Sequence, residues 1–101
     1  MNDVLILITT IASGKDLQKE KKAVFCERKF ASRSEFYAAF AAGQKVRYEF
    51  IVPLMDYLEM KIRDEKSGRM MYPSAVEYEG EELVIIRAYE IAGDRISLTC
   101  G

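Results

Sequence analysis

Residues 45–54 read Lys-Val-Arg-Tyr-Glu-Phe-Ile-Val-Pro-Leu, and this stretch decides the fold class. Apolar or aromatic side chains recur at every second position, from Val46 through Phe50 to Leu54, with polar or mixed side chains between them. A period of two residues is the signature of a β-strand with one face in a core. Pro53 cannot donate to a ladder, so we expect the chain to lie at a sheet edge or to leave the sheet there.

On both sides of this strand the sequence predicts further short strands. Residues 4–11 are rich in β-branched side chains, and residues 23–31 alternate imperfectly because Arg28 falls among the apolar positions. The polar residues 13–22 between them predict a loop. Towards the C-terminus, strands at 76–78, 83–91 and 95–100 are separated by Glu79-Gly80 and Ala92-Gly93-Asp94 turns, which predicts a three-stranded meander.

One helix is expected between the second and third strands. Ser32 and Glu35 have the spacing of a capping box, in which the serine oxygen and the glutamate side chain satisfy amides of the first turn. Phe36 and Phe40 then share one face, and Gly43 suits the residue that closes a helix. About ten residues is marginal for a helix in water, so this one should dock against other structure.

A protruding hairpin is predicted over residues 58–72. Leu58, Met60 and Ile62 alternate, Lys66-Ser67-Gly68 forms a turn, and residues 69–72 return toward Pro73. Methionine adapts to irregular contacts, and four of the five methionines lie in or just before this region: Met55, Met60, Met70 and Met71. Two interpretations stay open: the methionines fill gaps in the core, or the hairpin is a contact arm for an assembly partner.

Together these elements predict a mainly β chain. About six short strands, one short α-helix between strands 2 and 3, and a protruding hairpin fit a small antiparallel β-barrel or sandwich. The length of 101 residues is that of one domain, which would span residues 1–101.

The composition argues against catalysis. The sequence contains no histidine, the usual general base and a common metal ligand, so we expect no enzyme activity, no cofactor and no metal site. The acidic turn at Glu77, Glu79, Glu81 and Glu82 lacks the spaced oxygen ligands of a calcium loop and is interpreted as a solvated turn. Cys26 and Cys100 are too few for a disulfide framework and are expected to be reduced, buried thiols.

The net charge and the hydropathy of the chain restrict the kinds of partner that it is expected to bind. Fifteen basic and sixteen acidic residues give a net charge of −1, which argues against tight nucleic-acid binding. Arg47, Tyr48 and Phe50 mix basic and aromatic groups as single-strand binders do, but alternation puts the two kinds on opposite faces, so a core face backed by a solvated face is favoured. The longest apolar run is too short to cross a bilayer, and no membrane partner is expected.

Residues 24–43 carry a resemblance to a known family. The string from Val24 to Gly43, with Arg33-Ser-Glu-Phe-Tyr37 as its most specific part, resembles the phage head-tail joining, or head-closure, family. Further similar motifs follow at Asp56-Tyr57, Val76-Glu-Tyr78, Ile86-Arg-Ala-Tyr89 and the final stretch from Asp94 to Cys100. Two features depart from the family pattern: a long methionine-bearing hairpin stands after Asp56-Tyr57, and Glu81-Glu82 follow the glycine turn.

The resemblance implies a structural virion protein of a tailed phage or prophage. Such proteins form a ring between the portal or adaptor and the tail, close the head after DNA packaging and offer the tail a docking surface; contact with packaged DNA is passive. The chain would be made in the host bacterial cytoplasm and end at the head-tail interface of the virion. By the same resemblance the channel-facing segment comprises Ser32, Arg33, Glu35, Phe36, Tyr37, Phe40 and Gly43. The inserted hairpin offers Met60, Ile62, Met70, Met71 and Tyr72 to a partner.

A different class of protein stays open as an alternative. A monomeric β-barrel of OB or SH3 type, acting as an adaptor or ligand-binding module, would have the same composition and strand pattern. Neighbouring genes that encode a portal and tail proteins would distinguish the two.

Overall fold

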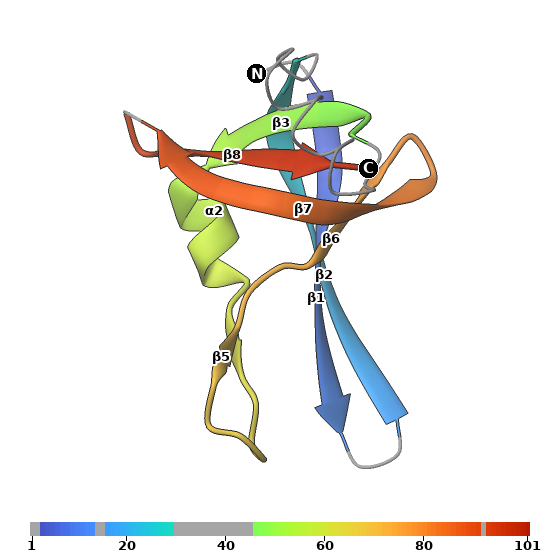
Figure 1. Cartoon of the computed structure of the whole chain (residues 1–101), viewed down its shortest axis with the longest axis vertical. Coiled ribbons are helices and arrows are strands. Elements are labelled where there is room, and N and C mark those ends of the chain that lie inside the picture. Colours follow the sequence, from blue (N-terminus) through green and yellow to red (C-terminus); the bar gives the residue numbers. More distant parts are fainter. Residues whose placement is uncertain (1–2, 14–15, 30–45, 92) are drawn as a thin grey trace.

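The computed structural model describes residues 3–13, 16–29, 46–91 and 93–101, and these are mainly β (Figure 1). Its single described helix follows the third strand directly. In chain order the elements are β1 (Asp3–Ser13), β2 (Asp16–Lys29), β3 (Tyr48–Pro53), α2 (Leu54–Glu59), β4 (Ile62–Arg63), β5 (Met70–Met71), β6 (Ala75–Tyr78), β7 (Glu81–Ile91) and β8 (Arg95–Cys100).

Six strands close into an antiparallel barrel, which confirms the predicted fold class. The strand order is β1-β2-β3-β8-β7-β6, and β6 closes the barrel by pairing with β1 over Ile6↔Glu77 to Ile8↔Ala75. The predicted meander is present as β6-β7-β8, with Gly80 and Gly93 at positive φ in its two turns. Strands β4 and β5 pair only with each other and form a separate hairpin below the barrel (Figure 1).

The barrel interior holds the core. Side chains from β1, β2, β3, β6, β7 and β8 meet there, and Phe50, Val52, Val76 and Leu98 are fully buried. The rings of Tyr48, Phe50 and Tyr78 contact one another with centroids 4.9–5.6 Å apart. Edge-to-face and tilted ring contacts of this kind add to the free energy of apolar burial.

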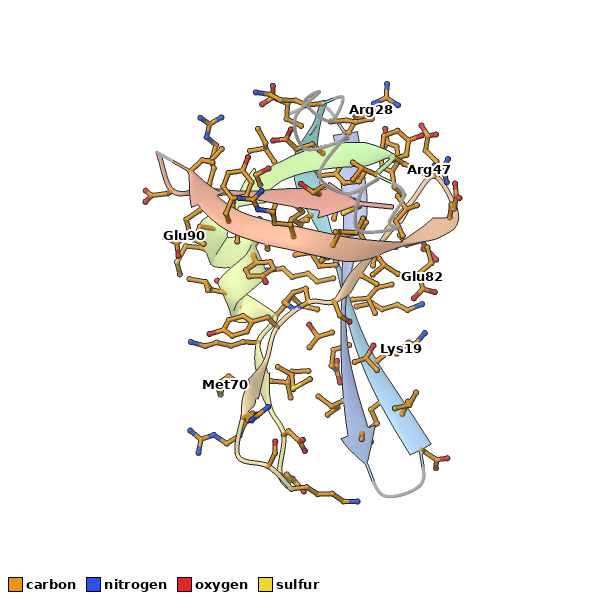
Figure 2. The ribbon with its side chains drawn as sticks, viewed as in Figure 1. Lys19, Arg28, Arg47, Met70, Glu82 and Glu90 are labelled. Atoms are coloured by element: carbon orange, nitrogen blue, oxygen red, sulfur yellow. The ribbon has the colours of Figure 1, made fainter. Side chains whose placement is uncertain are left out.

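Arg28 explains the imperfect alternation of the second strand. Its guanidinium lies over the rings of Tyr48 and Tyr78, 5.7 and 6.0 Å from their centroids. The side chain therefore caps an aromatic cluster at one end of the barrel, where its charged head stays in solvent (Figure 2). Arg28 thus occupies an inward-facing position of β2 at the end of the barrel, and the strand is not interrupted there.

The two cysteines lie in the core, as predicted. Cys26 and Cys100 are free thiols with no exposed surface. Burial raises the pKa of Cys26 to about 11 and that of Cys100 to about 12, because a thiolate loses its hydration there. Both thiols are thus held in the neutral, weakly nucleophilic form at neutral pH.

The prediction of a loop at residues 13–22 was wrong. Strand β2 begins at Asp16, and β1 pairs with it continuously from Asp3↔Cys26 to Ser13↔Asp16. The distal half of this pair extends past the barrel as a two-stranded ribbon (Figure 1). Residues 16–21 are all exposed there, so the apolar periodicity that marks a half-buried strand is missing.

The strand predicted to begin the hairpin at Leu58 was also wrong. Pro53 ends β3 and is the N-cap residue of helix α2, so the chain leaves the sheet at Pro53 as expected. Tyr57 is buried, while Leu54 and Leu58 pack against the same core one turn apart. The hairpin is correspondingly shorter and begins at Ile62. The helix predicted over Ser32–Gly43 lies outside the described residues.

Candidate assembly surfaces

Two arms project from the same side of the barrel: the β1–β2 ribbon, residues 8–13 and 16–21, and the β4–β5 hairpin, residues 62–71 (Figure 1). The hydroxyl of Thr9 donates a buried hydrogen bond of 2.8 Å to the carbonyl oxygen of Met60, just after α2. This bond joins the root of the ribbon to the root of the hairpin. Because both groups are buried, breaking the bond would leave a carbonyl without a partner.

Charged side chains reinforce the same junction. The ammonium of Lys22 on β2 lies 2.7 Å from a carboxylate oxygen of Glu59 and 3.4 Å from one of Asp56 on α2. The bond to Glu59 raises the pKa of Lys22. The groups are solvent-accessible, so the ion pairs fix the orientation of α2 more than they add stability.

The returning strand of the hairpin is held against α2 by two rings. Tyr57 and Tyr72 stack with centroids 5.9 Å apart and an interplanar angle of 10°. Tyr57 is buried, and this burial raises its pKa. The stack places Tyr72, with 43% of its surface exposed, on the outside of the molecule.

The structure divides the predicted partner-contact residues between core and surface. Met60 is only 8% exposed and packs in the core, which matches the gap-filling interpretation for this methionine. Ile62 and Met71 are half-buried, whereas Met70 and Tyr72 are exposed. Met55, on α2, is exposed as well. The exposed surface of the hairpin therefore centres on Met70 (Figure 2) and includes Tyr72.

Asp64 shapes the tip of the hairpin. One carboxylate oxygen accepts a hydrogen bond of 3.1 Å from the Lys66 amide, and the other accepts one of 2.9 Å from the Ser67 hydroxyl. These bonds, led by the one from the Lys66 amide, lower the pKa of Asp64. The Gly68 amide donates to the Asp64 carbonyl oxygen, with Gly68 at a φ of 72°. The turn is thus locally determined and presents Lys66 to solvent.

A cleft separates the two arms. One part, about 310 Å³ in volume, lies between Ile11, Ala12 and Gln18 of the ribbon and residues 62–66 of the hairpin. A second part, about 330 Å³, lies nearer the barrel between Glu20, Glu59, Met60 and Ile62. Ile62 lines both parts. Sequence reasoning missed the cleft, because it treated the ribbon as a loop.

Two of the four carboxylates of the acidic turn between β6 and β7 form ion pairs within the molecule. Glu81 forms an ion pair with Arg47, and Glu82 lies 3.6 Å from the ammonium of Lys19 on β2 (Figure 2). Arg47 also lies over the ring of Tyr48, 5.4 Å from its centroid. Phe50 is fully buried, which confirms the predicted core face of β3. The opposite face is only partly solvated, because Ile51 on that face is buried as well.

No metal-binding cluster appears among the residues that the structure describes. Within 3–13, 16–29, 46–91 and 93–101, no group of three or more Cys, Asp or Glu side chains is placed to hold a metal ion. No helix in those ranges is long and apolar enough to span a membrane. The predicted channel-facing residues, from Ser32 to Gly43, lie outside the described part.

No protein-family model matches the chain, and no curated protein sequence matches it.

Proposed function

We propose that this chain is a structural virion protein of a tailed phage or prophage, forming a ring between portal or adaptor and tail. In this role it closes the head after DNA packaging and provides the surface on which the tail docks. The proposal starts from the sequence blocks at Val24–Gly43 and Val76–Cys100, which resemble the head-tail joining family.

The observation that carries the proposal is the pair of arms beside a closed barrel. The barrel contains the core, so its stability does not require a long charged ribbon or a hairpin beyond it. Ordering backbone outside a core has an entropic cost of roughly 1–2 kcal/mol per residue, and exposed arms bury little apolar surface in return. Such arms are suited to contacts with neighbouring subunits, as a ring between two larger assemblies requires.

The electrostatics of the described surface agree with a protein–protein role. Glu81 and Glu82 of the β6–β7 turn are paired with Arg47 and Lys19, and the net charge of the chain is −1. A protein that holds DNA through its phosphates needs an excess of free cations. Partners would therefore be the portal or adaptor ring, the tail proteins and further copies of the chain.

Gene deletion in the phage or prophage that encodes the chain tests the proposal. Particles made without the protein should have heads that fill with DNA, fail to retain it and do not join tails, and a plasmid copy of the gene should restore infectious particles. Mass spectrometry of purified complete virions should find the chain. Normal tailed particles in its absence would overturn the proposal and favour a monomeric β-barrel adaptor.

A further inference from the structure

The outer face of the β1–β2 pair carries apolar side chains in solvent. Side chains alternate between the core and the outside along both strands, so every second residue belongs to this face. Val4 on β1 and Phe25 on β2 are cross-strand neighbours there, with 51% and 65% of their surfaces exposed. The next outward pair along the strands is half-buried Ile6 and exposed Ala23. Contiguous apolar side chains on the surface of a domain mark a place where it contacts another protein.

Charged side chains of opposite sign border this apolar patch. Lys21 follows Ala23 on the same face of β2, and Glu27 follows Phe25 at the other end. Neither Lys21 nor Glu27 forms an ion pair with a described residue. The patch therefore has an unpaired cation at one end and an unpaired anion at the other.

The other charges of the outer face are balanced. They lie on β2, on β6 and at the start of β7, and comprise Lys19, Lys29, Glu77 and Glu82. Lys19 and Glu82 already form an ion pair (Figure 2). With Lys21 and Glu27 included, cations and anions are equal in number, so net charge does not keep two copies of this face apart.

A two-fold rotation places unlike groups of this face opposite each other. With the axis across the strands, midway between Phe25 and Ala23, β2 lies antiparallel on β2 of a second copy. The large Phe25 ring then meets the small Ala23 of the copy, and Lys21 meets Glu27. Each of these contacts occurs twice, because a two-fold interface is self-complementary.

The same rotation also fits β1 and the ends of the contact. Val4 meets Ile6 of the copy, because these residues lie in the same rows as Phe25 and Ala23. Farther out Lys29 meets Lys19, whose charge is already balanced by Glu82. Two sheets commonly pack face to face with their strands nearly aligned, so the orientation is an ordinary one for β-structure.

From this self-complementarity we infer that the outer face of β1 and β2 binds a second copy of the chain in a two-fold dimer. The apolar patches of the two copies cover each other, and two Lys21–Glu27 ion pairs fix the register. A second copy is the partner that the face itself describes, because one copy supplies both the small residue opposite Phe25 and the anion opposite Lys21. The inference does not rest on the proposed function, since a closed two-fold pair is not a ring contact and forms without a particle.

The dimer should be weak, because the contact is limited to two strands. Interfaces below about 1,200 Å² of total buried surface belong to transient complexes. We therefore expect a dissociation constant on the order of 100 μM. Sedimentation of the full chain between about 10 μM and about 1 mM, a range that brackets this value, should show monomer converting to dimer and no larger species.

Charge reversal at the two border positions tests the partner and the register together. Lys21→Glu and Glu27→Lys each place like charges opposite one another twice, so each variant alone should dimerise at least about tenfold more weakly than the parent chain. In an equal mixture of the two variants, every cation meets an anion again across the mixed dimer. The mixture should therefore associate about as tightly as the parent.

Two further variants complete the test. Phe25→Ala should weaken the dimer, whereas Met55→Ala, which changes an exposed apolar residue on α2, should leave the dissociation constant within about twofold. The substituted side chains are exposed, and urea unfolding of each variant at low concentration checks that the monomer is intact. A parent chain that stays monomeric at about 1 mM, charge variants that dimerise like the parent, or a mixture no tighter than its components overturns the inference. Growth beyond the dimer with concentration would show an open contact and would also overturn it.

Discussion

The barrel and the arms of this molecule are specified in different ways. In the barrel, each strand turns an alternating set of side chains into one core, and Phe50, Val76 and Leu98 have no exposed surface. In the arms, most side chains are exposed, and order comes from the β1–β2 ladder, the Asp64 turn and a few contacts at the root. The comparison teaches that different parts of this fold serve different purposes. The barrel provides the stability, and the arms extend the molecule beyond the barrel.

Two phenylalanines on neighbouring strands give the largest expected difference. Phe50 is fully buried in the barrel, whereas Phe25 is 65% exposed on its outer surface. Phe50→Ala should lower the free energy of unfolding by about 3–5 kcal/mol, since it removes a large side chain and leaves a cavity. Phe25→Ala should change it by less than about 0.5 kcal/mol. Urea unfolding followed by circular dichroism measures both, and similar losses would show that the outer face is also packed.

The buried thiols predict a loss of barrel stability at alkaline pH. Burial raises the pKa values of Cys26 and Cys100 from the ordinary 9.0 to about 11 and about 12. The unfolded chain therefore loses these protons first, and stability present below pH 9 declines as the pH rises toward 11. Two thiols together should remove roughly 2–3 kcal/mol between pH 8 and pH 10.

The double variant Cys26→Ala, Cys100→Ala isolates this effect. It should be less stable at pH 8, yet its stability should fall less steeply between pH 8 and pH 10 than that of the parent chain. A thiol reagent at pH 8 should find two groups in denatured protein, freshly made without oxidant, and react slowly with the native protein. Parallel pH profiles of the two proteins would contradict the assignment to the thiols.

The junction between barrel and arms should be intermediate in sensitivity. Thr9→Val keeps the shape of the side chain but removes the hydrogen bond to the Met60 carbonyl oxygen. We expect a loss of about 1–2 kcal/mol and faster amide exchange in residues 9–13. Thr10→Val, on the other face of the same strand, is the matched variant and should have a smaller effect on both measurements. Equal effects would mean that the bond does not hold the arms together.

The sequence predicts the barrel of this molecule well and the arms poorly. The period-two pattern around Phe50 and the glycine turns at Gly80 and Gly93 predicted the barrel, because burial on one face imposes that pattern. Outside the barrel no face is consistently buried, so residues 16–22 carry no such pattern and their strand was missed. Helix α2 did leave a signal: Leu54 and Leu58 are one turn apart directly after Pro53.

The candidate site shows the same limit. A protruding hairpin with an exposed Met70 could be predicted from local turn chemistry. The cleft could not, because it depends on how β1 and the hairpin are placed relative to each other, which Pro73 and the Thr9 hydrogen bond determine. Met60 was grouped with the hairpin because it alternates with Ile62, yet it follows the helix and turns into the core.

Removing the tip of the hairpin should have only a small effect on stability. Residues 63–70 can be replaced by a short glycine-containing turn, which keeps Met60 in the core and the Tyr57–Tyr72 stack on α2. Because the removed residues lie outside the barrel, the free energy of unfolding should change by less than about 1 kcal/mol. If the hairpin is an assembly contact, particles carrying the shortened chain should nevertheless fail to mature. As a control, Lys61→Ala changes an exposed residue outside the excised segment and should support normal assembly. Unfolding of the shortened chain would assign the hairpin to the body of the protein, and normal particle yield would remove it from the list of assembly contacts.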